Sequence, residues 1–397
     1  MTPSRVTAPR VTTPHVALSL MPEDAFRIAA APLFAEGLVD AAEWSFDMGW
    51  DRKLAPWLEA LLDAYSGAGR LFGHGVHYSL LSVDDAAKQD RWLGALADEV
   101  RRRRYAHVSE HYGFMTDVNF RRGAPLPVPR CRASLAVARD RLARIRRVVG
   151  DVPVGLENLA LAWNRDECLA HGPFLDAILE APTDFVVLDV HNLHCQAVNF
   201  SLAPDTLLAT FPLHRVREIH VSGGSDQPAW KGGPSTVRCD THDEDVPEAV
   251  FVLLASALRA CPNVEAVIFE RLGNTLDDPR DVEGFRADFR RVRSIVHASQ
   301  AGNTSTAPGP AGAAPGTDAR GLEGLDPMDD ESALGAFQSA LLATLIDGGS
   351  EPELRGRLAR ERAFEPLRRH VVGMSSLGLG VASRVAKKWL RRAPSTA

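Results

Sequence analysis

The stretch "VREIHVSGGSDQPAWKGGPSTVRCDTHDEDVPEAV", residues 216–250, begins as an apolar strand and continues into a loop rich in glycine and proline. It places His220, Asp240 and His242, whose side chains can bind a metal ion, within one short span. Polar groups beside a buried strand are costly unless they are paired or bind a cation. The stretch therefore predicts a strand that carries functional residues at its carboxyl end. The glycine-rich part, 223–233, is expected to be a lid over such residues or a plain surface loop.

The same pattern recurs along the chain, where further short apolar runs are separated by segments with apolar residues three and four positions apart. These runs are "VALSL" (16–20), "AEWSFD" (42–47), "LFGHGVH" (71–77), "YAHVSEH" (105–111), "VPVGLEN" (152–158), "FVVLDV" (185–190) and "EAVIFER" (265–271). About eight alternations of strand and helix predict a parallel (β/α)8 TIM barrel. An open doubly wound sheet is the alternative, but no GxGxxG or GxxxxGK[ST] motif follows any run.

Composition divides the chain into four parts. Residues 1–14 are predicted to be disordered, and residues 15–297 are predicted to form the barrel. Residues 298–325 are rich in glycine, alanine and proline and predict a flexible linker. Residues 326–397 predict a small helical module, because apolar residues at helical spacing resume there between acidic and glycine residues typical of helix ends.

The bulk properties exclude several classes of protein. The chain has 397 residues, 45% hydrophobic and 24% charged, with a net charge of −6, which is typical of a globular protein and gives no reason to expect a nucleic-acid partner. No apolar run of about 18 residues and no signal-peptide core is present, so no membrane association is expected. The five cysteines are scattered without CxxC spacing, which indicates a reducing, cytoplasmic location rather than a disulfide framework.

Side chains that can bind metals recur at six successive predicted strand ends, from the third strand onward. They are His74, His77, His107, Glu110, His111, Glu157, Asn158, Asp189, His191, Asn192, His220, Asp240, His242 and Glu270. Imidazole, carboxylate and amide ligands without a thiolate suit iron or manganese and, less decisively, zinc. The candidates outnumber the ligands of one ion, so two or three ions that share carboxylates are predicted. Because alternation sends neighbours to opposite faces, some histidines, His107 among them, are expected to pack or to contact the ligands instead.

Seven motifs of this chain occur in the order and approximate spacing of the DUF692 proteins. They are "GHGVHYS", "HVSEHYGF", "GLENLA", "LDVHNLHCQAVN", "REIHVSGG", "CDTHDEDVPEAV" and "VIFER". The chain thus resembles this family of multinuclear non-heme iron-dependent oxidative enzymes over roughly residues 15–295. The resemblance implies a xylose-isomerase-like barrel that binds two or three irons and uses O2 to modify a residue, often cysteine, of a ribosomally synthesised precursor peptide. The family includes a methanobactin-biosynthesis enzyme that acts with a partner protein, so a separate leader-recognition partner is a further expectation.

The matching motifs also imply which residues form the site. The implied metal ligands are His74, Glu110, Glu157, Asn192, His220, Asp240, His242 and Glu270. His111, Asn158 and Asp189 are implied as catalytic residues that bind the metal or contact its ligands. The family usually has Asp where Glu110 stands, and the longer carboxylate can still bind or bridge iron at a different spacing.

Two other functions remain open from the sequence. A divalent-metal sugar isomerase or phosphodiesterase uses similar ligands on the same barrel, and a non-catalytic peptide-binding scaffold needs no working metal site. For the C-terminal module, capture of a leader peptide and a dimerisation or solubility role are both open.

Overall fold

The structure is a computed structural model that describes residues 13–84, 86–115, 125–231, 233, 235–303 and 324–389. The predicted disordered segment, 1–14, and the predicted linker, 298–325, lie mostly outside these residues.

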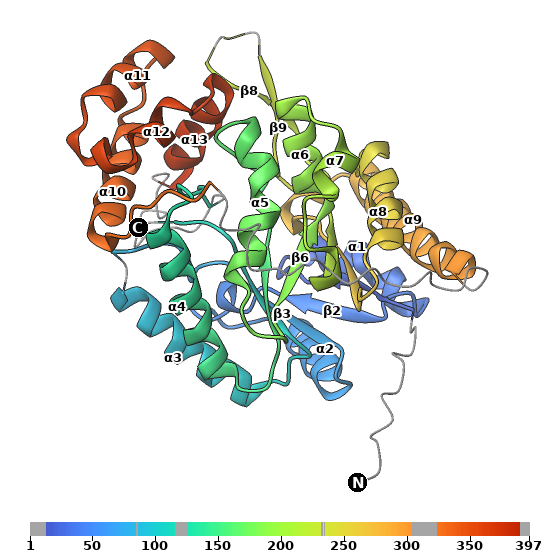
Figure 1. Ribbon diagram of the computed structural model, residues 1–397. Coiled ribbons are helices and arrows are strands. Elements are labelled where there is room, and N and C mark those ends of the chain that lie inside the picture. Colours follow the sequence, from blue (N-terminus) through green and yellow to red (C-terminus); the bar gives the residue numbers. More distant parts are fainter. Residues whose placement is uncertain are drawn as a thin grey trace, which may run out of the picture.

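Eight parallel strands close into a barrel in the order β1-β10-β7-β6-β5-β4-β3-β2 (Figure 1). They are β1 (His15–Ser19), β2 (Ala41–Trp44), β3 (Leu71–Gly75), β4 (Val108–His111), β5 (Val154–Glu157), β6 (Phe185–Asp189), β7 (Val216–Val221) and β10 (Ala266–Phe269). Each strand falls on one of the eight apolar runs, and the pairing of β1 with β10 closes the sheet. The predicted TIM barrel is confirmed.

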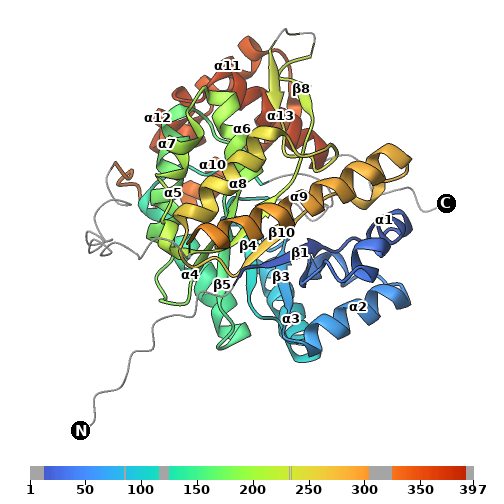
Figure 2. The ribbon, with the colours of Figure 1, turned by 90° about the vertical axis from the view of Figure 1, so that its right-hand side faces the viewer.

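Helices surround the barrel (Figure 2). They are α1 (Asp24–Ala35), α2 (Pro56–Gly67), α3 (Ala86–Arg102), α4 (Arg132–Val149), α5 (Arg165–Ile178), α6 (Val190–Phe200), α7 (Pro204–Leu208), α8 (Glu248–Ala260) and α9 (Pro279–Asn303), with the short 3-10 helices η1 (Phe46–Met48), η2 (Leu213–Arg215) and η3 (Gly273–Thr275). Each long helix covers the barrel with apolar residues at helical spacing, as Leu58 and Leu62 of α2 illustrate. Helix α9 continues to Asn303, into the segment predicted as linker. Among the described helices, none combines the length and the apolar character needed to span a bilayer.

Strand alternation divides the barrel interior into two layers. An apolar layer contains small and large side chains, Ala17, Ala41, Phe72, Ala266 and Ile268. Two residues further toward the carboxyl ends of the same strands, the buried inward positions are polar: Ser19, Glu43, His74 and Glu270. Since residues two apart share a face of a strand, the barrel has an apolar floor beneath a polar layer.

The predicted C-terminal helices are present and form a small bundle (Figure 1). They are α10 (Glu331–Asp347), α11 (Glu351–Arg360), η4 (Arg362–Leu367), α12 (Arg368–Val372) and α13 (Ser376–Trp389). The rings of Phe337 and Phe364 pack edge to face in its interior, 5.1 Å apart. Both views place this bundle beside an antiparallel hairpin, β8 (Asp226–Pro228) and β9 (Thr236–Arg238), which the sequence analysis did not predict (Figures 1 and 2).

Candidate metal centre

Most of the predicted site residues converge at the carboxyl ends of the strands. Three groups of candidate ligands lie at the strand ends, each with its ligand atoms within 4.8 Å of one another: the first is His74, His111 and Glu157, the second is Glu157, Asp189, His220 and Glu270, and the third is Asp189, Asp240 and His242. A fourth group, Glu43, Glu218 and His220, meets the same criterion toward the barrel interior. Glu157 and Asp189 each belong to two groups. The three groups are therefore one continuous cluster joined by two carboxylates, which is the arrangement that bridging ligands require.

Glu157, at the end of β5, is the hub of this cluster. Its Oε2 lies 3.3 Å from His74 Nε2 and 3.2 Å from His111 Nε2, while its Oε1 lies 3.5 Å from His220 Nδ1. Burial opposes ionisation, but the surrounding imidazoles outweigh it and hold the pKa of Glu157 well below its ordinary value. The carboxylate is thus charged and faces three nitrogen ligands at once.

His220, in the middle of the cluster, has carboxylates on both ring nitrogens. Its Nε2 lies 3.0 Å from Glu218 Oε1 and 3.1 Å from Glu43 Oε2, toward the barrel interior. Its Nδ1 lies 3.5 Å from Glu157 and 3.4 Å from Glu270. Burial lowers the pKa of His220, but these carboxylates outweigh it and raise the pKa well above the ordinary value. The metal-free protein therefore holds an imidazolium there, and Nδ1 is the nitrogen that faces the other ligands.

Glu218 connects His220 to a further buried histidine. Its Oε2 lies 2.5 Å from Nε2 of His107, whose ring stacks on Phe72 of the apolar floor at 4.5 Å. A carboxylate on the nitrogen opposite the metal fixes the tautomer and orientation of a ligating histidine. Sequence reasoning missed Glu218 and Glu43. Glu218 could have been found from its position two residues before His220, on the same face of the strand.

Removal of the Glu218 carboxylate is expected to weaken metal binding without unfolding the barrel. Glu218→Gln should lower metal affinity about tenfold and Glu218→Ala up to about 100-fold. The reason is that Nε2 of His220 loses its nearer carboxylate and keeps only Glu43, whose pKa burial raises. Competition with a chromophoric chelator measures the affinity. The control is Glu99→Gln, since Glu99 is a buried carboxylate that pairs with Arg103 on the helical shell. Equal affinities in all three variants would contradict the role of Glu218.

The loop that follows β7 brings Asp240 and His242 to the cluster. His242 Nε2 lies 2.7 Å from Asp240 Oδ1, and His191 Nδ1 lies 3.4 Å from the same oxygen. His242 has a φ of 52°, which is uncommon for a residue other than glycine and marks backbone strain of the kind that collects at functional sites. A side chain at Gly224 would overlap the carbonyl of Cys239, so only glycine lets the loop close against the strand end.

The three amide and carboxylate residues at the ends of β5 and β6 have different roles. Asn158 Oδ1 accepts a hydrogen bond from the backbone N–H of Asp189, and its Nδ2 donates to the Asp189 carbonyl. Asn192 Nδ2 donates to the Asn158 carbonyl, and Asp189 Oδ1 accepts from the Asn192 N–H. Asn158 therefore joins the two strand ends, whereas Asp189 and Asn192 each retain one buried oxygen outside this network.

Glu110 points away from the cluster. Its neighbours Ser109 and His111 face inward, and Ser109 Oγ lies 2.8 Å from His74 Nδ1, so alternation sends Glu110 to the opposite face of β4. Burial, together with the charge of Asp47, raises the pKa of Glu110 well above its ordinary value. Among the groups found in the described part of the chain, Glu110 belongs to none.

Buried atoms that lack a hydrogen bond provide an independent test of whether these residues fit a metal. Within the described residues, the buried atoms without a hydrogen bond include Glu157 Oε2, Asp189 Oδ2, Asn192 Oδ1, His220 Nδ1 and Glu270 Oε2. Buried polar atoms are normally paired, and leaving them unpaired is costly. These atoms belong to neighbouring residues at one end of the barrel, and a cation would satisfy them together. The donor set of nitrogen and oxygen fits iron, manganese or zinc.

Metal binding is expected to release protons at neutral pH. Burial lowers the pKa of His74, but the charge of Glu157 outweighs burial and raises this pKa to about 9. In the same way, Asp240 and Glu270 outweigh burial at His242 and raise its pKa to about 10. Both imidazoles are therefore protonated at pH 7 without metal and must lose a proton to bind one. Apparent affinity should rise with pH, by up to about tenfold per unit for each proton released. Calorimetry in buffers of different ionisation enthalpy measures this release. Its absence would show that the two imidazoles either are not protonated in the metal-free protein or do not bind the ion.

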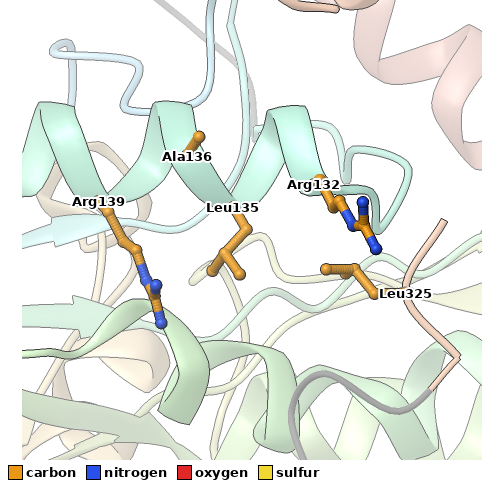
Figure 3. Close-up of a pocket in the computed structure, with 5 residues that line it drawn as sticks. All are labelled: Arg132, Leu135, Ala136, Arg139 and Leu325. Carbon is orange, nitrogen blue, oxygen red and sulfur yellow. The ribbon is translucent and has the colours of Figure 1, made fainter. Parts of the chain in front are cut away.

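A surface hollow of about 310 Å³ lies beside α4 (Figure 3). Its lining consists of Arg132, Leu135, Ala136 and Arg139 of α4 together with Leu325. No residue of the three ligand groups lines it, as far as the described residues show. The hollow is therefore a feature separate from the candidate metal centre.

A family model described as "RiPP precursor modification enzyme MbnB/TglH/ChrH" matches residues 50–295, more than half of the chain. The chain belongs to this family. The DUF692 assignment made from the seven motifs is thereby confirmed.

Relatives of this MbnB/TglH/ChrH protein include a UPF0276 protein from Caulobacter vibrioides, which is 31% identical over 247 residues, or 61% of this chain and 82% of the relative. A UPF0276 protein from Acaryochloris marina is 29% identical over 231 residues, or 54% of this chain and 79% of the relative. Solved structures with a similar fold include a xylose isomerase-like TIM barrel protein from Mycobacterium smegmatis, with 11% identity, a TM-score of 0.44 and coverage of 72% of this chain and 98% of that one. At this level of similarity, the solved structure carries no argument about function.

Proposed function

We propose that this MbnB/TglH/ChrH protein is a multinuclear non-heme iron enzyme that uses O2 to modify a residue, in the first instance cysteine, of a ribosomally synthesised precursor peptide. Family membership supports the peptide substrate. The observation that carries the multinuclear site is the sharing of Glu157 and Asp189 between groups of candidate ligands. None of the five cysteines, all of which lie within the described residues, forms a disulfide, which agrees with a proposed site of action in the reducing cytoplasm.

His74, His111, Glu157, Asp189, Asn192, His220, Asp240, His242 and Glu270 would hold the metal ions. Bound iron would supply the binding and reduction of O2. The protein's own residues bind and orient the ions and keep water away from most of the cluster, since Glu157, Asp189 and His220 are buried. His111, Asp240 and His242 retain 20–22% exposure of their side chains. The peptide would therefore approach from the side of these three residues.

The test uses protein purified without oxygen and loaded with Fe²⁺. The reading frames next to the gene are searched for a short cysteine-containing precursor peptide, which then serves as the substrate, with and without any partner protein encoded there. We expect at least two irons per chain, oxygen consumption that requires the peptide, and a mass change confined to one residue of the peptide. Metal analysis, an oxygen electrode and tandem mass spectrometry measure these quantities.

The same experiment separates the alternatives. Turnover of a sugar or phosphodiester with zinc or manganese, independent of O2, would replace the proposal with an isomerase or phosphodiesterase. Peptide binding without metal would replace it with a scaffold. The scaffold result would also require another explanation for the buried atoms of the cluster that lack a hydrogen bond.

A further inference from the structure

The C-terminal helices lie outside the region that matches the MbnB/TglH/ChrH family, which ends at residue 295. They nevertheless contact the loops that follow the barrel strands on the side of the metal centre. Gln338 of α10 donates to the Leu81 carbonyl in the loop after β3 at 2.6 Å. The N–H of Ser375, just before α13, donates to the Trp163 carbonyl in the loop after β5 at 2.8 Å. The helices therefore pack against the carboxyl-end face of the barrel.

Helix α13 makes the closest approach to these loops. A Cβ added to Gly378 would lie 2.7 Å from the carbonyl oxygen of Trp163, after β5. A Cβ added to Gly380 would lie 2.6 Å from the carbonyl oxygen of Ala229, in the hairpin after β7. Real Cβ atoms do not tolerate such contacts with backbone atoms. Two glycines thus allow one helix to lie against the loops of two different strands.

The hairpin β8–β9 is bound to α13 by side chains as well. Arg384 of α13 donates to Gln227 Oε1 in β8 at 2.6 Å. Trp230 Nε1, at the turn of the hairpin, donates to the Ser376 carbonyl at 3.2 Å. On the other strand, the Asn199 side chain of α6 bonds both the N–H and the carbonyl of Arg238 at 2.9 Å. The hairpin is therefore held between α13 and α6.

The end of this hairpin leads directly into the metal centre. Arg238 is the last residue of β9, and Asp240 and His242 follow it within four residues. Any displacement of β8 from α13 passes to β9 through the antiparallel pairing of Asp226 with Arg238. The loop has little freedom to absorb it, because His242 already occupies a strained backbone region.

We propose that the C-terminal module is a positioning element of the site: α13 braces the hairpin β8–β9 and thereby holds Asp240 and His242 in place. The module is then an integral part of the catalytic face rather than an appendage for solubility. The proposal rests on the proposed function only in treating Asp240 and His242 as metal ligands. It accounts for a helical extension, outside the family match, that contacts the loops around the centre.

The test compares two glycine substitutions in the full-length chain. Gly380→Val should push α13 from the Ala229 carbonyl, while Gly356→Val on α11 is the control, because a Cβ there would meet only the flexible end of Arg360 at 3.4 Å. Hydrogen exchange of the metal-free proteins is read at residues 226–228 and 236–242, and Co²⁺ affinity and visible spectrum are read separately. In Gly380→Val we expect exchange about tenfold faster in these segments, Co²⁺ affinity about tenfold lower and an altered spectrum, with Gly356→Val unchanged.

A second variant keeps the proposal testable if Gly380→Val does not fold. Arg384→Gln removes the bond to Gln227 at a partly exposed position, and it should change exchange and Co²⁺ affinity in the same direction by a smaller factor. Unchanged exchange in both variants, or faster exchange with wild-type Co²⁺ affinity and spectrum, would overturn the proposal. Failure of the wild-type protein to use iron and O2 would overturn the proposed function alone, because exchange and Co²⁺ binding are measured without turnover.

Discussion

The Glu157→Gln variant is expected to lose most of its bound metal and at least about 1,000-fold of its activity, equivalent to about 4 kcal/mol. Glu157 faces His74, His111 and His220 at 3.2–3.5 Å and belongs to two of the three ligand groups. An amide carries no charge and offers one acceptor oxygen in place of two, so it cannot bridge two cations. The loss should therefore exceed one ion per chain, as measured by elemental analysis after loading with Fe²⁺.

A matched control for this variant is Glu167→Gln. Glu167, in the first turn of α5, is partly buried, and desolvation raises its pKa to about 7 despite the nearby charge of Arg130. It belongs to none of the ligand groups found among the described residues, so the same chemical change should leave the metal content unaltered. Wild-type metal content in Glu157→Gln would show that the groups around Glu157 do not form a common centre.

The second large effect is expected for His220→Ala, which should abolish activity and lower iron content while the barrel stays folded. The substitution removes the nitrogen that faces Glu157 and Glu270, and the imidazolium that balances Glu43 and Glu218 in the metal-free protein. Loss of one partner of a buried ion pair costs about 3–5 kcal/mol, so the metal-free variant should melt lower than the wild type at pH 7.

The fall in melting temperature caused by His220→Ala is expected to depend on pH. The imidazolium of His220, with a raised pKa, stabilises the folded state fully below its unfolded value near 6.5, and this contribution fades as pH rises through the folded value. In the variant, the carboxylates near position 220 lose one of their cationic partners, and at strongly acidic pH their protonation removes this penalty. The difference in melting temperature between wild type and variant should therefore be largest near neutral pH. It should narrow at alkaline pH, where His220 loses its proton, and at strongly acidic pH, where the carboxylates gain theirs. The control is His171→Ala, since burial lowers the pKa of His171 to about 3 and its removal uncovers no charge. Full activity in His220→Ala would remove His220 from the ligand set.

Much of the fold and the location of the candidate centre could be predicted from the sequence alone. An apolar run such as 185–190, followed by a helical segment, specifies a buried parallel strand, because burial of both faces requires continuous apolar residues. Parallel strands in a closed barrel all end at one face. Polar residues at successive strand ends, such as Glu157, His220 and Glu270, are therefore expected to lie close together, however far apart they are along the chain.

Only the tertiary structure decided which side chains face the centre and what supports them. Glu110 and His111 are neighbours that can both bind a metal ion, yet the register of β4 turns His111 inward and Glu110 outward. The roles of Glu43 and Glu218 can be recognised only in the structure. There β2 and β7, which are distant in sequence, direct both carboxylates at the same nitrogen of His220. The docking of α13 depends on backbone atoms at Trp163 and Ala229, which no local pattern encodes. Composition and periodicity determine which elements form, whereas contacts between distant elements depend on three-dimensional packing.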